Sequence, residues 1–293
     1  MIFNSPVYPI PPSFKSGELE LQSTQKYLEY LKEHGAQHVM TTAGTSQFNL
    51  LSIEEVRELN SEVLNFSGNK IIGLPALSTP LIKKEIHFLN ERKADNTYLL
   101  IIFPERYYTD SQVVNFFREI SKYSSYPILG HTTPVRKGNG GNYSYSQDLL
   151  KSLSNIDGFL GVKEESPSLD FASNSIQDLD LEIIVAGGSM KRFWALNPFG
   201  ATTFLSGVGS LFPFFDERFF SLYSGSDPKE AMSIIKNVET PFFNSFMNIG
   251  WHASMRFGLN QLGLLEGNRS PFITLCDKEK ETIKSAISQL PLP

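Results

Sequence analysis

The chain has 293 residues, of which 41% are hydrophobic, and its formal net charge is −5. A chain of this length forms one large domain or two smaller ones, and barrels of this size commonly form one. The negative net charge argues against a nucleic-acid-binding protein, which needs a basic surface.

Eight short apolar runs recur along the chain, and the intervals between them leave room for helices. Most of the runs are continuous rather than alternating, which is typical of strands buried on both faces of a sheet. We expect strands at residues 4–10, 38–43, 70–76, 97–104, 126–132, 156–163, 181–187 and 201–207.

Helical patterns lie between these runs. Gly35 is expected to end the first helix, and Ser52 with Glu55 forms a capping box that predicts the start of the second. The expected helices span residues 23–35, 52–66, 79–93, 110–123, 144–155, 166–177 and 189–197.

Strands that alternate with helices indicate right-handed strand–helix–strand units and a parallel sheet. Eight such units predict an α/β fold of the closed (β/α)8 type, the TIM barrel. The alternative is an open doubly wound sheet, which usually carries a glycine-rich phosphate turn after its first strand. The stretch PIPPSFKSGE at residues 9–18 is not such a turn.

The alternation stops after Pro213, where helical patterns follow without further strands. We therefore expect a barrel over residues 1–213 and a C-terminal helical extension over residues 214–293. The expected helices of the extension span residues 227–238, 240–263 and 277–290.

The cysteine content and the N-terminus exclude further classes of protein. A single cysteine, Cys276, excludes an internal disulfide framework and a cysteine-based metal cluster. The opening MIFNSPVYPIPPSF lacks the basic and apolar segments of a signal peptide, and no apolar run is as long as a membrane span. We expect a cytoplasmic protein that binds neither a membrane nor nucleic acid.

One lysine stands at the end of a buried predicted strand, where barrel enzymes build their active sites. It is Lys163, in the stretch GFLGVKEES. Burial disfavours the charged form of a lysine, and the free amine then attacks carbonyl groups. The alternative is that Lys163 pairs with Glu164 or Glu165 on a solvated loop.

Groups that bind carboxylates stand at the ends of other predicted strands. Thr45, Ser46, Ser189 and Ser206 offer hydroxyls and backbone donors, and Arg136 offers a bidentate fork. A lysine that faces such groups indicates a Schiff-base enzyme for a 2-oxo acid, because the iminium accepts electrons from the adjacent carbon.

Several stretches resemble one family nearly from end to end. They are AGTSQFNLLSIEE (43–55), GFLGVKEES (158–166), GATTFLSGVGSLFP (200–213) and LGLLEGNRSPFITL (262–275). The chain resembles the family of dihydrodipicolinate synthase and N-acetylneuraminate lyase, class I aldolases built on a (β/α)8 barrel. The resemblance implies that Lys163 is the Schiff-base residue.

The chain departs from the family pattern at two sites. Gly44 and Thr45 stand where the family has two adjacent threonines. Gly130 and His131 stand where the family has a tyrosine that relays protons. Either His131 takes that role, which the pKa of histidine allows, or the chemistry is different. A histidine that only bonds a backbone carbonyl is the structural alternative.

Three further positions resemble family residues. Tyr107 and Tyr108 resemble paired tyrosines, one of which reaches across a subunit interface, so the resemblance implies a homo-oligomer, a dimer or tetramer. The alternative is that both are ordinary surface or interface aromatics. Arg136 stands where dihydrodipicolinate synthases grip the carboxylate of the aldehyde, whereas neuraminate lyases lack that arginine.

The leading hypothesis is a Schiff-base lyase that joins pyruvate, or a related 2-oxo acid, to an aldehyde, with dihydrodipicolinate synthase activity as the default. The alternatives are an aldolase or dehydratase of a sugar-derived 2-oxo acid and a 2-oxo-acid-binding protein without turnover. We expect no metal and no other cofactor. The expected catalytic residues are Lys163, His131 and Tyr107, and the expected substrate-binding residues are Gly44, Thr45, Ser46, Arg136, Gly187 and Ser206.

Overall fold

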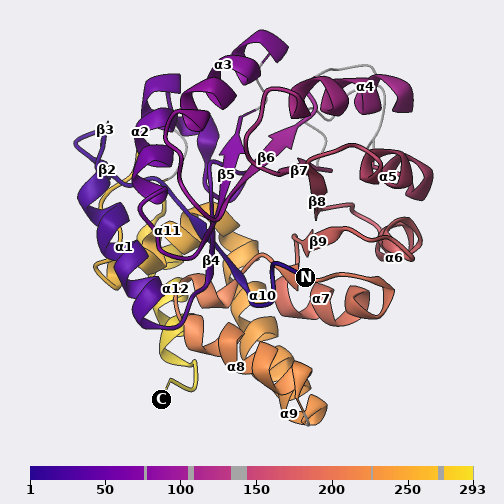
Figure 1. Ribbon diagram of the computed structural model, residues 1–293. Helices are drawn as coiled ribbons and strands as arrows, with labels where there is room; N and C mark the ends of the chain where they lie inside the picture. Colours follow the sequence, from indigo (N-terminus) through magenta and orange to yellow (C-terminus); the bar gives the residue numbers. More distant parts are fainter. Residues whose placement is uncertain (76–77, 105–108, 133–143, 226, 270–273, 293) are drawn as a thin grey trace. The chain divides into compact units, whose positions relative to one another are not determined.

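The computed structural model describes residues 1–75, 78–104, 109–132, 144–225, 227–269 and 274–292 (Figure 1). The chain divides into two units. The first unit contains Met1–Asn4 and Asn69–Leu205, and the second contains Ser5–Gly68 and Ser206–Pro293. The boundary that we expect at residue 213, between barrel and extension, stays a prediction.

The first unit contains a parallel sheet in which each strand pairs with the next one along the chain. Its strands are nearly all buried, as their continuous apolar sequences predict. They are β5 (Asn69–Leu74), β6 (Thr97–Ile102), β7 (Ile128–His131), β8 (Phe159–Glu164), β9 (Glu182–Val185) and β10 (Thr203–Phe204).

Helices connect these strands in turn (Figure 1). In α4, Thr109 and Gln112 form a capping box, and buried residues recur at helical spacing along one face. The helices are α3 (Thr79–Asn90), α4 (Asp110–Ser121), α5 (Gln147–Ser154), α6 (Leu169–Ile176) and α7 (Ser189–Leu196), and a short 3₁₀ turn η2 (Asn197–Phe199) follows α7.

Strand β8 contains an irregularity that sets its register. Ile128 of β7 pairs with Phe159, but the next residue of β7, Leu129, pairs with Gly161, so Leu160 is an extra residue. Gly161 also lies very close to β9, because a Cβ there would come within 2.0 Å of the carbonyl oxygen of Glu182. After the bulge, His131 of β7 pairs with Lys163 of β8.

The second unit opens with two parallel strands, β1 (Val7–Ile10) and β4 (His38–Thr41). Between them lie a small antiparallel hairpin that we do not predict from the sequence and the helix α1. The capping box of Ser52 and Glu55 is present at the start of α2. The remaining elements are β2 (Phe14–Lys15), β3 (Glu18–Leu19), α1 (Leu21–Glu33), η1 (Phe48–Leu50) and α2 (Ile53–Val63).

The C-terminal part of the second unit is helical, as predicted, but it differs from the prediction in two places. The aromatic stretch after Phe212 forms a helix that the sequence pattern does not predict. The helix expected over 240–263 breaks at Gly250, whose φ of 128° cannot continue a helix. The elements are η3 (Val208–Ser210), α8 (Pro213–Ser224), α9 (Pro228–Ile234), a π turn η4 (Ile235–Glu239), α10 (Thr240–Ile249), α11 (Trp251–Gln261) and α12 (Asp277–Ser288). No helix among the described residues is long and apolar enough to cross a membrane.

Helix α8 contains one buried carboxyl group, of Asp216, and one half-buried carboxyl group, of Glu217. Asp216 is fully buried, and its Oδ1 accepts a hydrogen bond of 3.2 Å from the backbone N–H of Gly209. Burial raises the pKa of Asp216 to about 7, and the charge of Glu217 adds to the effect. Burial also raises the pKa of Glu217 to about 7, although its Oε1 accepts a hydrogen bond of 2.8 Å from the hydroxyl of Tyr8.

These two carboxyl groups contribute stability that is lost as the pH rises from about 4 to about 7. In this window the folded chain binds protons at Asp216 and Glu217 that the unfolded chain has already lost, so raising the pH favours unfolding. Each group contributes a slope of at most about 1.4 kcal/mol per pH unit. The lowered pKa values of His38 and His131 give a contribution of the opposite sign below about pH 6.5. Urea unfolding of the wild type and of Asp216→Asn between pH 4 and pH 8 isolates the contribution of Asp216.

Asp216→Asn is expected to remove part of this slope and to raise stability at pH 8, because the amide oxygen still accepts from Gly209 without a charge. The control is Asp157→Asn, the same change in an exposed turn. An Asp216→Asn variant that keeps the full pH dependence of the parent would contradict the assignment.

Candidate active site

Lys163 lies near the end of β8 and is buried, with only 1% of its surface exposed. On the neighbouring strand β7, His131 is the last residue and is likewise buried. The two residues are register partners in the parallel pairing of β7 with β8. The carboxyl ends of both strands therefore bring an amine and an imidazole to the same edge of the sheet.

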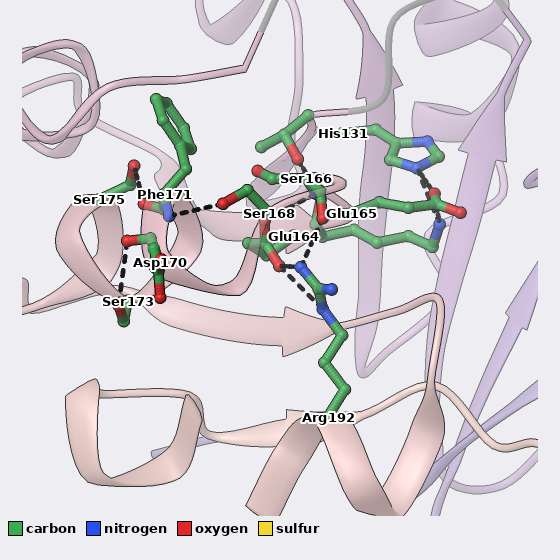
Figure 2. A network of polar contacts seen from close by, with 12 residues as sticks. His131, Glu164, Glu165, Ser166, Ser168, Asp170, Phe171, Ser173, Ser175 and Arg192 are labelled. Atoms are coloured by element: carbon green, nitrogen blue, oxygen red, sulfur yellow. Dashed lines mark hydrogen bonds and ion pairs between the residues drawn. The ribbon is translucent and has the colours of Figure 1, made fainter. Parts of the chain in front are cut away.

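A carboxylate joins them. Lys163 Nζ lies 2.7 Å from His131 Nε2 and 2.6 Å from Glu165 Oε2, and the same two atoms of His131 and Glu165 lie 2.7 Å apart. Figure 2 shows the Glu165 side chain directed toward His131. The alternative that we considered for Lys163, a pairing with a neighbouring glutamate, is thus half correct. The pair exists with Glu165, but the lysine is buried rather than solvated.

Glu164, which lies between Lys163 and Glu165 in the sequence, points to the opposite side of the strand. Successive residues of a strand face opposite sides, so Glu164 leaves the sheet on the side away from Lys163. There its Oε2 accepts from Arg192 Nη2 of α7 at 2.6 Å, and its Oε1 accepts from the backbone N–H of Ser166 at 2.7 Å. Arg192 also donates to the carbonyl oxygen of Ser166 at 2.7 Å (Figure 2). This buried ion pair fixes the backbone on both sides of Glu165.

Thr132 extends the connection between the two strands beyond their last residues. Its backbone N–H donates to the carbonyl oxygen of Lys163 at 3.1 Å, and its hydroxyl donates to the same oxygen at 3.2 Å. That hydroxyl also accepts from the backbone N–H of Glu165 at 3.0 Å. The backbone of Glu165 is therefore held, although its side chain is 36% exposed.

The charges of the three groups differ. Burial lowers the pKa of His131 to about 4, and the nearby charge of Lys163 adds to the effect. The imidazole is therefore neutral at neutral pH. Burial raises the pKa of Glu165, but the charge of Lys163 and the contacts with His131 outweigh burial and hold this pKa well below its usual range. Glu165 is therefore a carboxylate anion.

Gly187 follows β9 and lies beside Glu165, because a Cβ on it would be 3.9 Å from Glu165 Cγ. Its φ of 73° suits glycine. Ser189, at the start of α7, is buried, and its Oγ has no hydrogen-bond partner among the described residues. Gly187 thus joins Lys163 and His131 at one place in the first unit.

The other expected binding residues belong to the second unit or lie outside the described residues. Gly44 and Thr45 are half-buried in the turn after β4, and the buried Ser46 donates its hydroxyl to the carbonyl oxygen of Met40 at 3.3 Å. Ser206 is buried and donates its backbone N–H to Val7. Tyr107 and Arg136 lie outside the described residues.

Sequence reasoning does not single out Glu165 as a site residue. Lys163 and Glu165 are two residues apart, a spacing that places both side chains on the same face of a strand. The strand predicted from the sequence, however, ends at Lys163. Strand β8 continues to Glu164. Among the described residues, no group of three or more metal-ligating side chains is arranged to hold a metal ion.

Comparison with known proteins places the chain in a family. The model of the Dihydrodipicolinate synthetase family matches residues 4–290. The chain belongs to this family. It is accordingly an enzyme of the class I lyase type, related to Schiff-base aldolases.

Individual members of the family are distant in sequence but similar in fold. The 4-hydroxy-tetrahydrodipicolinate synthase of Moorella thermoacetica is 23% identical over 283 residues, which are 96% of this chain and 95% of the relative. The structure of a monomeric dihydrodipicolinate synthase variant matches with a TM-score of 0.85 at 19% identity, over 97% of this chain and 96% of the other. The chloride-inhibited synthase of Acinetobacter baumannii complexed with pyruvate matches with a TM-score of 0.84 at 20% identity, over 97% and 98%. The predicted (β/α)8 barrel with C-terminal helices is thereby confirmed.

Proposed function

We propose that the protein forms a Schiff base between Lys163 and pyruvate, or a closely related 2-oxo acid, and joins the product to an aldehyde. The observation that carries this proposal is the contact of 2.7 Å between the buried Lys163 amine and the neutral His131 imidazole. The family of the chain and the pyruvate complex of the Acinetobacter baumannii synthase support the choice of 2-oxo acid. Synthesis of 4-hydroxy-tetrahydrodipicolinate is the default activity.

Imine formation requires protons to move at the Lys163 nitrogen. The ammonium group passes a proton to His131 Nε2, and the neutral amine then attacks C2 of the 2-oxo acid, forming the N–C bond and an alkoxide. The alkoxide takes the proton back from His131 and gives a carbinolamine. His131 then transfers a second proton from the nitrogen to the hydroxyl group, which leaves as water, and a cationic imine remains. One water molecule is lost, and the positive charge stays on nitrogen.

The substrate carboxylate is assigned to the turn after β4. Backbone N–H groups around Gly44 and Ser46, with the hydroxyl of Thr45, are suited to an anion, and this turn resembles the carboxylate loop of the family. Gly187 and Ser206 complete the proposed set, and Arg136 holds a second carboxylate on the aldehyde. Tyr107 is proposed as a further proton-transfer residue on the same resemblance.

A second candidate reaction is the cleavage or dehydration of a sugar-derived 2-oxo acid. The observation that favours it is the pair His131 and Glu165 beside the lysine, in place of the tyrosine that the family uses. A panel of aldehydes, assayed by pyruvate consumption and by pyruvate release, separates this reaction from the default activity. Failure with every acceptor would favour a binding protein without turnover.

Borohydride trapping tests the Schiff base itself. The protein is incubated with pyruvate and sodium borohydride, and its intact mass is measured. The mass of the protein should increase by the mass of one pyruvic acid molecule minus one oxygen atom, because reduction converts the imine to a stable secondary amine. A wild-type mass that stays unchanged at saturating pyruvate would overturn the proposed function.

Thr45→Val is expected to raise the pyruvate concentration needed for half-maximal trapping by about tenfold. This is the effect of losing one hydrogen bond to a charged group. The control is Thr282→Val, which changes an exposed residue of α12 in the same way. An unchanged concentration dependence in Thr45→Val would remove Thr45 from the carboxylate site.

We further propose that the protein works in the cytoplasm as a homo-oligomer, a dimer or a tetramer. The paired tyrosines Tyr107 and Tyr108 support this proposal by their resemblance to the family residues at a subunit interface. A monomeric variant exists among similar structures, so the assembly is a property to be measured by sedimentation.

A further inference from the structure

Glu165 combines a contact with the Lys163 nitrogen and a partly exposed side chain. Its Oε2 lies 2.6 Å from the Lys163 nitrogen, so it stands beside the atom that becomes the imine. Its side chain is also 36% exposed, whereas Lys163 and His131 are buried. The carboxylate therefore contacts the buried amine and is itself reached by solvent.

The geometry brings this oxygen close to a second reacting atom. In a pyruvate imine, C3 is bonded to C2, and C2 is bonded to the nitrogen, so C3 lies about 2.5 Å from Lys163 Nζ. An oxygen atom at 2.6 Å from that nitrogen is within contact distance of a C3 hydrogen when C3 lies on the Glu165 side of the nitrogen and the methyl group turns toward it. His131, which is buried, contacts the same nitrogen at 2.7 Å.

We propose that Glu165 is the catalytic base that removes a proton from C3 of the imine and returns it in the reverse step. This assignment rests on the proposed function of Lys163. In the step, the C3–H bond breaks and its electron pair forms the C2=C3 double bond. The π electrons of the C=N bond move to nitrogen, and the proton binds Glu165. The product is a neutral enamine beside a neutral carboxylic acid, and nothing is oxidised or reduced.

The electrostatics of the cluster favour this step. Before the transfer, a cationic imine faces a carboxylate anion, and after it both groups are neutral, which a partly buried site favours. The pKa of Glu165 is held down by the charge at Lys163, whereas burial acts to raise it. Loss of the positive charge therefore makes Glu165 a better proton acceptor as the enamine forms.

The surroundings of Glu165 fix its direction. The Thr132 hydroxyl holds its backbone N–H at 3.0 Å, and the ion pair of Glu164 with Arg192 anchors the preceding residue. Gly187 lies beside its side chain and leaves that side without a Cβ. His131 and Glu165 thus have separate tasks, protons on nitrogen and oxygen for the first and the proton on carbon for the second.

The experiment measures the two steps separately. Exchange of the pyruvate methyl hydrogens in D2O, followed by proton NMR, reports proton removal from C3. Borohydride trapping reports imine formation. For Glu165→Gln we expect methyl exchange to slow by about a hundredfold or more, the usual effect of one acid–base group, and trapping to change by less than about tenfold. Glu165→Asp should recover part of the exchange.

The controls separate this inference from the proposed function. Asp170→Asn, on the exposed first turn of α6, should match wild type in both assays. A wild type that is not trapped would overturn the Schiff base and this inference together. A trapped wild type whose Glu165→Gln variant exchanges at the parent rate, or loses trapping and exchange equally, would overturn only the role of Glu165. Should Glu165→Gln not fold, equal slowing of both steps in Glu165→Asp would overturn it.

Discussion

Lys163→Ala is expected to abolish borohydride trapping by pyruvate. The substitution removes the amine that contacts both His131 and Glu165. Lys163→Arg should fail as well, because a guanidinium stays protonated at every working pH and cannot attack a carbonyl. Intact mass after reduction should equal the mass of the untreated protein in both variants.

Folding must be checked in the same variants, because Lys163 is buried and charged. Removing it leaves the Glu165 carboxylate without its cation, so a lower melting temperature is expected together with a native circular dichroism spectrum. Lys151→Ala, in an exposed position on α5, is the matched control and should be trapped normally. A folded Lys163→Ala protein that still gains the mass of reduced pyruvate would show that another amine forms the imine.

His131→Phe is expected to slow imine formation by about a hundredfold or more, while leaving the amine in place. A positioned acid–base group usually contributes about a hundredfold to ten-thousandfold, and His131 is the ring in contact with Lys163. The rate is measured by quenching with borohydride at successive times. His87→Phe, on the exposed face of α3, is the control. A wild-type rate in His131→Phe would move the relay to Tyr107 or Tyr108.

The pH dependence of imine formation should reflect the lowered pKa of His131. The imidazole accepts protons only in its neutral form, which prevails above a pH of about 4. The rate should therefore stay level through pH 6.5, where an ordinary histidine titrates, and fall only as the pH approaches 4. His131→Phe should lose this acidic limb. A limb centred near pH 6.5 in the wild type would mean that the ring is solvated.

Much of the fold could be predicted from local sequence. The sequence predicts a strand at 156–163, because a continuous apolar run marks a strand buried on both faces, and β8 lies at Phe159–Glu164. Helix α8 was not predicted, since aromatic residues occur all around it and leave no clear polar face. The break at Gly250 depends on a backbone angle that the helical pattern does not reveal.

The candidate site likewise has features that the sequence predicts and features that it does not. The sequence predicts that Lys163 and His131 end neighbouring strands, and their register pairing agrees. Glu165 is missed because the predicted strand ends at Lys163, whereas β8 continues to Glu164 and so places Glu165 on the same side as Lys163. An ordinary histidine has a pKa near neutrality, but the value of about 4 for His131 depends on complete burial and on the adjacent cation. Both properties come from packing rather than from residue type.

Within the paired stretch of β7 and β8 that the structure describes, Leu160 is the one residue that has no partner in β7, so β8 can lose it without a change of register. Pairing with β7 skips Leu160 and resumes at Gly161, so a strand shortened by one residue there would still present Lys163 opposite His131. The same loss at Val162 would exchange the two sides of the strand. The ammonium group would then face Arg192, and a glutamate would take the position of the nucleophile. Deletion of Leu160 is therefore expected to preserve the contact of Lys163 with His131, whereas deletion of Val162 is expected to abolish it.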